Sequence, residues 1–447
     1  MNDQPRRSAA EGVSEILAAA DLCVKCGLCL PHCPTYLETR DEGESPRGRI
    51  ALIQGLLTGQ LPRTRRGTAH LDRCLVCRAC EVVCPARVPY GRIIDGARAE
   101  LQRQRPHGPL RRGLRWLAAE GFVRDPWWLR RAVRLLRGYR DSALARRIQA
   151  ALGPLSPRLR RLTGFLPPLL PARAWATVYR AQGEPRGEVA LFLGCVAREV
   201  DRATLEASLR VLTRLGYTVY VPRGQVCCGA MHLHEGAEAE ALARVARNIR
   251  AFEAFRALPI VVTASGCGAT LAEYDRLSGL HSEWLQRARE LARRVVDVND
   301  FLAGVAWPKG LLPAALPIRV AVHEPCSLRN VLARPQGPYR LLERIPGLEV
   351  VPLPGNERCC GSAGAYMLTQ PKMADRLRDT KLEAFSTTGA RLLVTANIGC
   401  ALHLAAGFTA LGTPVEVVHP VILVDRQLGP SADHDAQPLV APASTGP

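Results

Sequence analysis

Two short runs near the start of the chain decide its organisation: CVKCGLCLPHCP at residues 23–34 and CLVCRACEVVCP at residues 74–85. In each run two, two and three residues separate the four cysteines, and a proline follows the fourth. The cysteines are Cys23, Cys26, Cys29 and Cys33 in the first run, and Cys74, Cys77, Cys80 and Cys84 in the second. A single tight turn can direct three thiolates at this spacing towards one small metal centre, which indicates an inorganic cluster.

This spacing is that of bacterial two-cluster ferredoxins, in which the fourth cysteine ligates the other cluster. It predicts one [4Fe–4S] cluster on Cys23, Cys26, Cys29 and Cys84, and a second on Cys74, Cys77, Cys80 and Cys33. The proline after each fourth cysteine suits the first turn of a helix, where its missing N–H is not needed. Paired CxxC motifs can also bind zinc, but an isolated four-cysteine zinc site has no use for a third cysteine at this spacing.

Length and composition indicate a globular protein of two or three domains. The chain has 447 residues, of which 47% are hydrophobic and 23% charged. Sixteen cysteines could suggest a secreted disulfide scaffold, but eight of them have cluster spacing, so a cytosolic metalloprotein is the better interpretation. The N-terminus lacks the apolar core of a secretory signal, and no run of about 18 apolar residues could span a membrane. We therefore expect the cytoplasm, with the inner face of the cell membrane as an alternative.

Positive charge is concentrated in one segment. The net charge is +19, yet lysine occurs only at positions 25, 309, 372 and 381, an arginine bias typical of genome composition. Residues 101–175 alone carry 17 arginines and three acids, with four interleaved tryptophans. A basic amphipathic helix with tryptophans can lie on an anionic membrane, but a linker whose helices pack on neighbouring domains is the preferred interpretation. Nucleic-acid binding is not expected, because no motif of that kind is present.

From residue 187 onward the sequence repeats itself. Both copies contain a strand-like run ending in cysteine, then CCG, then a second strand-like run ending in cysteine. The cysteines are Cys195, Cys227, Cys228 and Cys267 in the first copy, and Cys326, Cys359, Cys360 and Cys400 in the second. The offsets between matching landmarks are 131, 132 and 133 residues, which indicates an internal duplication.

Each copy is expected to form a small parallel βαβ sheet. The predicted strands are 189–193, 218–221 and 260–263, then 320–322, 350–353 and 392–395. Amphipathic helices such as 203–215 alternate with these apolar runs, as in α/β domains. Four of the cysteines directly follow strands, at the sheet edge where open α/β sheets place their sites, so each copy should gather its cysteines into one pocket.

The predicted architecture is α/β with an N-terminal α-helical two-cluster ferredoxin module and two duplicated parallel-sheet domains. A lead-in helix before residue 23 and helices over 45–57 and beyond Pro89 belong to the module. The predicted parts are the module (1–100), an arginine-rich helical linker (101–186), the two cysteine-rich repeats (187–310 and 311–427) and a disordered tail (428–447).

Two ferredoxin runs followed by paired C…CCG…C repeats resemble the cysteine-rich domain family, which includes subunits of heterodisulfide reductase, anaerobic glycerol-3-phosphate dehydrogenase and glycolate oxidase. The most similar pattern is that of the glycolate oxidase iron–sulfur subunits. It rests on SPRGRIALI (45–53), QVCCGAMHLHEG (225–236), ERCCGSAGAYMLTQP (357–371) and TANIGCALHL (395–404), besides the two cysteine runs.

The resemblance implies an electron-transfer subunit of an oxidoreductase that acts on CH–OH donors. An FAD-containing partner would oxidise glycolate to glyoxylate, and this chain would pass the electrons to a quinone or another respiratory acceptor. The chain itself has no dinucleotide-type GxGxxG. Glycerol 3-phosphate or lactate as the partner's substrate, and a thiol–disulfide enzyme of the heterodisulfide reductase type, are the alternatives.

The repeats depart from the fuller family pattern, because Ala264 and Asn397 stand where relatives of heterodisulfide reductase have the first cysteine of a CxxC. Each copy thus has four cysteines rather than five. A third cluster, a zinc ion, redox-active thiols and buried structural thiols are all left open for the eight repeat cysteines. His323 is a candidate additional ligand or proton donor, and His232 and His234 are weaker candidates.

Overall fold

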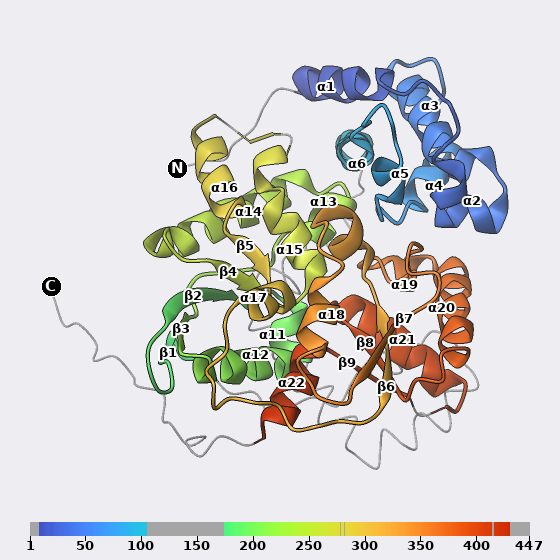
Figure 1. Ribbon diagram of the computed structural model, residues 1–447. Helices are drawn as coiled ribbons and strands as arrows, with labels where there is room; N and C mark the ends of the chain where they lie inside the picture. Colours follow the sequence, from blue (N-terminus) through green and yellow to red (C-terminus); the bar gives the residue numbers. More distant parts are fainter. Residues whose placement is uncertain (1–8, 105–173, 278, 281, 414, 430–447) are drawn as a thin grey trace, which may run out of the picture.

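The computed structural model describes residues 9–104, 174–277, 279–280, 282–413 and 415–429. A helical N-terminal module lies beside two sheet-containing units that follow it in the chain (Figure 1). Most of the predicted arginine-rich linker and almost all of the predicted tail lie outside the described residues, as do the expectations attached to them. Within the described ranges no helix is both long enough and apolar enough to cross a bilayer.

The N-terminal module is built from short helices around a small apolar core. Its α-helices are α1 (Ala9–Asp21), α2 (Pro34–Thr39), α3 (Pro46–Leu57), α4 (Arg65–Asp72), α5 (Ala79–Val82) and α6 (Tyr90–Arg103). The predicted lead-in helix and the helices at 45–57 and beyond Pro89 are confirmed. Helix α3 begins as the sequence suggests, because the Ser45 hydroxyl accepts a hydrogen bond from the Gly48 N–H at 2.9 Å. Ile53 of α3 and Ile93 of α6 are fully buried in the core.

The first repeat forms a five-stranded sheet in the order β1-β3-β2-β4-β5. The strands are β1 (Val178–Tyr179), β2 (Gly187–Phe192), β3 (Tyr217–Tyr220), β4 (Ile260–Val262) and β5 (Val295–Asp297). The helices are α11 (Val196–Val200), α12 (Arg202–Arg214), α13 (Ala230–His234), α14 (Glu238–Phe252), α15 (Ser265–Ala272), α16 (Ser282–Ala292) and α17 (Val298–Gly304).

The second repeat forms a four-stranded parallel sheet in the order β7-β6-β8-β9. The strands are β6 (Arg319–His323), β7 (Glu349–Pro352), β8 (Leu392–Thr395) and β9 (Glu416–Val418). The helices are α18 (Gly337–Leu342), α19 (Tyr366–Thr369), α20 (Pro371–Ser386), α21 (Ile398–Ala410) and α22 (Pro420–Leu428), besides a short π-helix over Ser327–Val331.

The mixed α/β class is confirmed, but the expectation of two purely parallel sheets is wrong for the first repeat. Strand β1 pairs antiparallel with β3, and it comes from residues that the sequence analysis assigned to the linker. It covers an edge of β3 that would otherwise present unpaired backbone groups. Strands β5 and β9 extend the opposite edge of each sheet and were not predicted from the sequence.

Strand order brings the cysteines of each repeat together. Strand β2 lies between β3 and β4, and β6 lies between β7 and β8. The connections next to β2 therefore run to opposite sides of that strand, and the same holds for β6. Such a change of direction opens a crevice at the carboxyl ends of these strands. Cys195 and Cys326 directly follow the two central strands, and this topology places them in those crevices.

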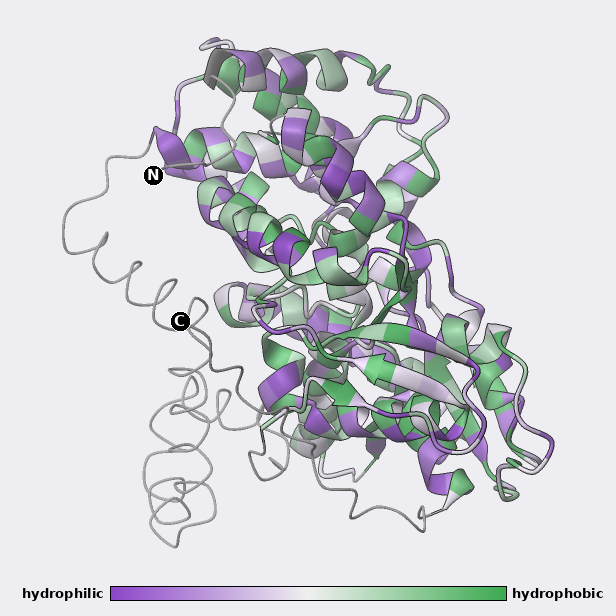
Figure 2. Ribbon diagram, turned by 90° about the vertical axis from the view of Figure 1, so that its left-hand side faces the viewer, coloured by the Kyte–Doolittle hydropathy of each residue, from purple (hydrophilic) through white to green (hydrophobic). Residues whose placement is uncertain are grey.

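The two repeats share a hydrophobic core. One buried cluster contains Val189 and Leu191 of β2 together with Val320 and Val322 of β6. Helix α12 of the first repeat packs on α22 of the second, and α17 packs on α18. Figure 2 shows strands that are largely hydrophobic and helices that alternate between hydrophobic and hydrophilic residues, as expected for amphipathic helices covering a sheet.

Candidate iron–sulfur and thiol site

The two ferredoxin-type loops repeat one unusual backbone conformation. Lys25 and Val76 occupy matching positions and have φ of 56° and 50°; Gly27 and Arg78, also matched, have φ of 87° and 59°. Such values are uncommon for residues other than glycine and costly for a β-branched valine. These left-handed residues bend each loop between successive cysteines. This strained turn occurs in both loops, and it suits a loop that directs three thiolates towards one cubane cluster.

The second loop lines a cavity together with the fourth cysteine of the first run. Cys33, Cys74, Cys77 and Cys80 all border this space of about 320 Å³, part of which is open to solvent. Burial raises the pKa of the Cys80 thiol, and the nearby Cys77, Cys74 and Cys33 raise it further. This is the crossed set of four predicted for the second cluster. The donor set fits a [4Fe–4S] cluster, and the ligation itself stays a prediction.

Polar groups surround the sulfur atoms of this second set. The Tyr90 hydroxyl donates to Cys74 Sγ at 3.5 Å, and the Val76 N–H donates to the same sulfur at 3.4 Å. Thr35 Oγ1 lies 3.4 Å from Cys33 Sγ, and Arg49 Nη1 donates to that sulfur at 3.9 Å. Hydrogen bonds to cluster sulfur favour the reduced, more negative state, so these groups would raise the potential of a bound cluster.

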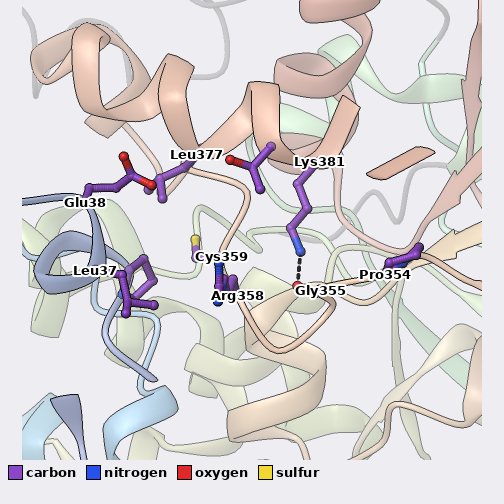
Figure 3. Close-up of a pocket in the computed structure, with 10 residues that line it drawn as sticks. Leu37, Glu38, Pro354, Gly355, Arg358, Cys359, Leu377 and Lys381 are labelled. Carbon is purple, nitrogen blue, oxygen red and sulfur yellow. Dashed lines mark hydrogen bonds between the residues drawn. The ribbon is translucent and has the colours of Figure 1, made fainter. Parts of the chain in front are cut away.

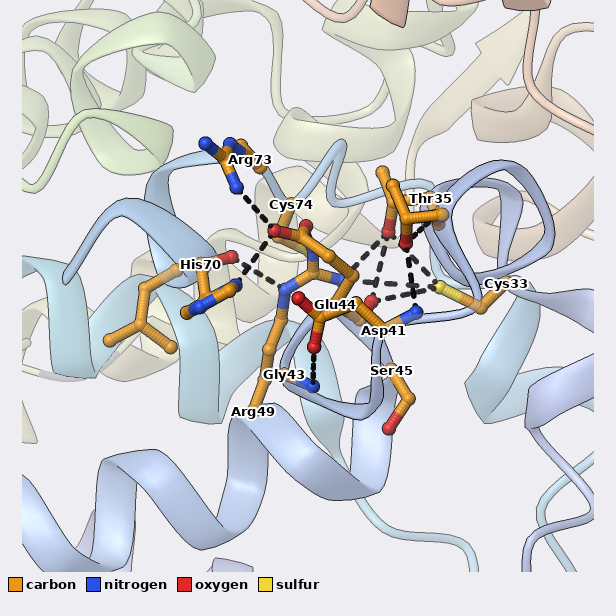
Figure 4. Close-up of polar contacts among 12 residues, drawn as sticks. Cys33, Thr35, Asp41, Gly43, Glu44, Ser45, Arg49, His70, Arg73 and Cys74 are labelled. Atoms are coloured by element: carbon orange, nitrogen blue, oxygen red, sulfur yellow. Dashed lines mark hydrogen bonds and ion pairs between the residues drawn. The ribbon is translucent and has the colours of Figure 1, made fainter. Parts of the chain in front are cut away.

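A buried ion network holds Arg49 in place (Figure 4). Arg49 is 1% exposed, and its Nη2 lies 2.6 Å from Glu44 Oε2. Glu44 also binds His70 at 2.8 Å and Arg73 at 2.9 Å. Burial lowers the pKa of Arg49, but Cys74, Tyr90, Cys33 and Glu44 together raise it above its usual value. The sequence does not predict this network, although SPRGR (45–49) carries part of the family resemblance.

The first loop lies at the surface. Cys26 is exposed, and so are three neighbouring apolar side chains: Leu22, Val24 and Leu28 are 50%, 73% and 56% exposed. Burial raises the pKa of the adjacent Cys29 to about 11, and Cys23 and Cys33 contribute by charge repulsion. Cys23, Cys26 and Cys29 therefore belong to one accessible turn. The place of Cys84 in this ligand set stays a prediction.

The second loop also contacts the second cysteine-rich repeat. Asn330 Nδ2 donates to the Cys77 carbonyl oxygen at 2.8 Å. Leu75 packs in one apolar cluster with Cys359 and Tyr366, with Cys77 and Cys326 against it. Burial raises the pKa of Cys77, and Cys326 is the next largest cause, which places these two thiols near each other. The predicted second cluster and the second repeat pocket are therefore neighbours.

The four cysteines of the second repeat do gather into one pocket. Cys326 Sγ lies 3.9 Å from Cys359 Sγ. His323, Cys360 and Cys400 are buried, and their ligand atoms lie within 4.8 Å of one another. Within the part of the chain that the structure describes, this is the one group of three close metal-ligand atoms.

The first repeat also gathers its four cysteines. Cys195 adjoins Cys227, Cys227 adjoins Cys228, and Cys228 adjoins Cys267. His232 adjoins Cys227 and is buried, so it belongs to this pocket. His234, the other histidine of the loop, instead places Nδ1 3.1 Å from Asp95 Oδ1 of α6, where it joins the repeat to the N-terminal module.

A cleft lies between α2 of the module and α20 of the second repeat (Figure 3). It measures about 400 Å³, part of it open to solvent. Its lining consists of Pro34, Leu37, Glu38, Pro354, Gly355, Arg358, Cys359, Leu377, Thr380 and Lys381. Pro34 also lines the cavity of the second loop, so the two spaces share a wall. Lys381 donates to the Gly355 carbonyl, and burial lowers its pKa.

Comparison with known proteins identifies the same modules. Residues 19–88 match the 4Fe-4S dicluster domain family, which implies two [4Fe–4S] clusters, and residues 189–272 and 320–405 match the cysteine-rich domain family. The predicted duplication is thereby confirmed.

Two relatives match most of the chain, and a third matches about half of it. The chain is 34% identical over 405 residues to the probable glycolate oxidase iron-sulfur subunit of Bacillus subtilis, covering 89% of this chain and 91% of the relative. It is 34% identical over 413 residues to the glycolate oxidase iron-sulfur subunit of Escherichia coli, covering 90% and 93%. Lactate utilization protein A of Geobacillus kaustophilus is 33% identical over 237 residues, which are 52% of this chain and 96% of that protein.

Proposed function

Since the chain belongs to the family of glycolate oxidase iron–sulfur subunits, we propose that it carries electrons from a flavin-containing partner that oxidises glycolate to glyoxylate. The observation that carries the proposal is the pair of matched cysteine loops, one exposed and one buried against the second repeat. Oxidation of glycolate releases two electrons and two protons. Two clusters can accept the electrons one at a time, which is what [4Fe–4S] centres do.

The exposed first loop is the proposed arrival point of the electrons. Leu22, Val24 and Leu28 form an apolar rim beside the exposed Cys26. Apolar side chains at the centre of an interface are buried when a partner docks. Close packing at this rim would bring the flavin of the partner near the first cluster. The second loop, buried between the module and the second repeat, would then receive each electron from the first.

The cleft beside the second loop is the proposed site of the acceptor. It shares Pro34 with the cavity of that loop, and its walls carry proline and leucine side chains. Lys381 and Arg358 offer cationic donors to a carbonyl oxygen of a quinone ring. A quinone that takes up two electrons and two protons there becomes a quinol, which balances the oxidation of glycolate.

Glycolate is preferred to lactate as the partner's substrate because of the extent of the similarity. The glycolate oxidase relatives match about nine-tenths of this chain, including both repeats, whereas the lactate utilization relatives match about half. The partner subunit decides which hydroxy acid is oxidised. Cluster reduction by the purified complex, compared between glycolate and lactate, tests this preference directly.

The relay can be tested at its exposed end. In the complex with the flavin partner, Val24→Asp and Leu28→Asp are expected to slow glycolate-driven cluster reduction at least about tenfold, the effect of losing one buried apolar contact at an interface. Dithionite should still reduce both clusters, which shows that the variants fold. Leu312→Asp, at a leucine that is 77% exposed and far along the chain, is the matched control.

Two results would overturn the proposal. One is a complex that oxidises glycolate while its clusters, followed by electron paramagnetic resonance, stay oxidised in the absence of any acceptor. The other is unchanged cluster reduction in both rim variants, which would move the arrival point elsewhere.

A further inference from the structure

We propose that the second cysteine-rich repeat holds a single zinc ion, bound by His323, Cys360 and Cys400 with Cys359 in the fourth position. This assignment goes beyond electron transfer, because zinc has no redox chemistry and the site would be structural. It also chooses one of the alternatives that the sequence left open for the repeat cysteines.

Three separate elements converge on this site. His323 ends strand β6, Cys360 lies in the loop after β7, and Cys400 lies in the first turn of α21. Their exposed fractions are 1%, 1% and 3%, and their ligand atoms lie within 4.8 Å of one another. Cys359, the peptide neighbour of Cys360, adjoins it through its thiol. One imidazole and three thiolates make the Cys₃His set of structural zinc sites.

The histidine is already oriented as a ligand. Its Nδ1 lies 2.9 Å from Thr395 Oγ1 of the adjacent strand β8, while its Nε2 is buried and has no hydrogen-bond partner. A buried polar atom without a partner is costly, and a metal bond would satisfy it. Metal-bound imidazoles usually anchor their other nitrogen in this way, since that bond fixes the tautomer and the ring.

Further donors surround one of the thiols. Asn397 Nδ2 donates to Cys400 Sγ at 3.3 Å, and the Ser362 hydroxyl donates to the same sulfur at 3.8 Å. Donors aimed at a sulfur stabilise the thiolate, which is the form that binds metal. Asn397 stands where the fuller family pattern has a cysteine, so this side chain supports a ligand rather than being one.

The spacing of the ligand atoms favours one ion over a cluster. The four thiolates of a [4Fe–4S] cube each bind a different iron at a different corner, so they lie well apart. Ligands of one tetrahedral zinc lie at about 2.0–2.3 Å from a common centre and therefore close to one another. Ligand atoms within 4.8 Å of one another need only a small contraction to reach that arrangement.

The first repeat has no histidine at the position that matches His323, and its buried His232 lies in α13 instead. Phe192 occupies the position that His323 holds in the second repeat, three residues before the first cysteine in each case. Phe192 is 2% exposed and packs against Phe252, with ring centroids 6.1 Å apart. No comparable trio of ligand atoms occurs among the described residues there. We therefore assign zinc to the second repeat alone.

Metal analysis of the full chain, purified without oxygen, tests the assignment. About one zinc per chain is expected besides the iron of two clusters, and zinc X-ray absorption should report sulfur near 2.3 Å and nitrogen near 2.0–2.1 Å. His323→Phe, which copies the residue of the first repeat, should remove the zinc and leave iron and sulfide unchanged. His232→Phe, at the buried histidine of the first repeat, is the control and should keep the zinc.

Three outcomes would overturn the zinc site. They are wild-type protein without zinc, zinc retained in both His323→Phe and Cys360→Ser, and iron for a third cluster that disappears in Cys400→Ser. Since none of these measurements involves glycolate, a failed zinc site and a failed electron relay are distinguishable. A His323→Phe chain that keeps both cluster signals shows that any loss of zinc is local rather than a failure to fold.

Discussion

A hydrogen bond from one phenol reaches the predicted second cluster. Tyr90 is 3% exposed, and its hydroxyl donates to Cys74 Sγ. Tyr366 is another buried tyrosine of this region, but its hydroxyl has no hydrogen-bond partner. Of the two phenols, Tyr90 alone donates a hydrogen bond to a ligand sulfur. Such a donor stabilises the reduced cluster and so raises its midpoint potential.

Tyr90→Phe is expected to lower the midpoint potential of the second cluster by roughly a few tens of millivolts, since it removes one hydrogen bond to a ligand sulfur. A redox titration followed by electron paramagnetic resonance measures the shift. Tyr366→Phe should leave the potential close to that of the wild type. Equal shifts in the two variants would mean that the phenol acts through packing and not through its bond to sulfur.

Among the elements, α6 joins the N-terminal module to the first repeat. Arg98 of α6 donates to the His234 carbonyl at 2.9 Å and to the Cys74 carbonyl at 2.8 Å. Gly236, just after α13, has φ of 77°, and a Cβ there would lie 2.5 Å from the Arg98 carbonyl oxygen. Only glycine permits both the left-handed conformation and this close approach. One helix thus supports the second cysteine loop and the repeat beneath it.

Gly236→Ala is expected to weaken this docking. The left-handed conformation alone should cost about 1 kcal/mol of unfolding free energy. The collision with the α6 backbone should add about 1–3 kcal/mol. Gly224→Ala is the matched control, because Gly224 has φ of 83° but nothing within 4 Å of the added Cβ. Denaturant unfolding compares the two variants; equal losses would show that α6 and the turn do not press on each other.

At the scale of the whole molecule, the cleft forms only because the module and the second repeat pack together. Leu37 and Glu38 come from α2, whereas Leu377, Thr380 and Lys381 come from α20, more than 300 residues later. A separate apolar cluster holds α20 against the second cysteine loop, because Ala374 and Leu377 of α20 pack with Leu75. The position of the acceptor site therefore depends on how these two units pack together rather than on either one alone.

Thr380→Trp should fill the cleft, raise the KM for quinone and lower glycolate-to-quinone activity, while glycolate-driven cluster reduction continues. Thr380 is an exposed residue of α20 whose hydroxyl bonds the Arg376 carbonyl, so the variant should fold. Thr409→Trp is the control, because Thr409 makes the same local bond on α21 and does not line the cleft. Unaltered quinone kinetics in Thr380→Trp would place the acceptor elsewhere.

Much of the architecture could be predicted because its signals are local. The predicted strands correspond to β2, β3, β4, β6, β7 and β8, since each is a short apolar run next to an amphipathic helix. The strands that were missed are short edge strands. Strand β1 has only two residues. Strands β5 and β9 are as long as β4, but neither is a continuous apolar run, because β5 ends in Asp297 and β9 begins with Glu416.

The candidate sites also divide into parts that the sequence predicts and parts that only the packing of separate elements creates. The cysteine spacing predicted both cluster loops, because ligands of one turn are close in sequence. The Arg49–Glu44 network and the cleft were not predicted, because their members come from separate elements. The sequence makes His323 a candidate ligand, but the position of its unpaired Nε2 beside Cys360 and Cys400 depends on how β6, β8 and α21 pack.

The sequence by itself determined the kinds of module present, their order and the cysteines of each, because motif spacing and apolar periodicity are properties of neighbouring residues. Only the tertiary structure decided which thiols meet across modules, which loop is exposed and in which repeat a histidine and two cysteines form a close trio. These relations join residues that are tens to hundreds of positions apart in the sequence. They arise from the packing of helices and sheets, which the pattern of neighbouring residues does not determine.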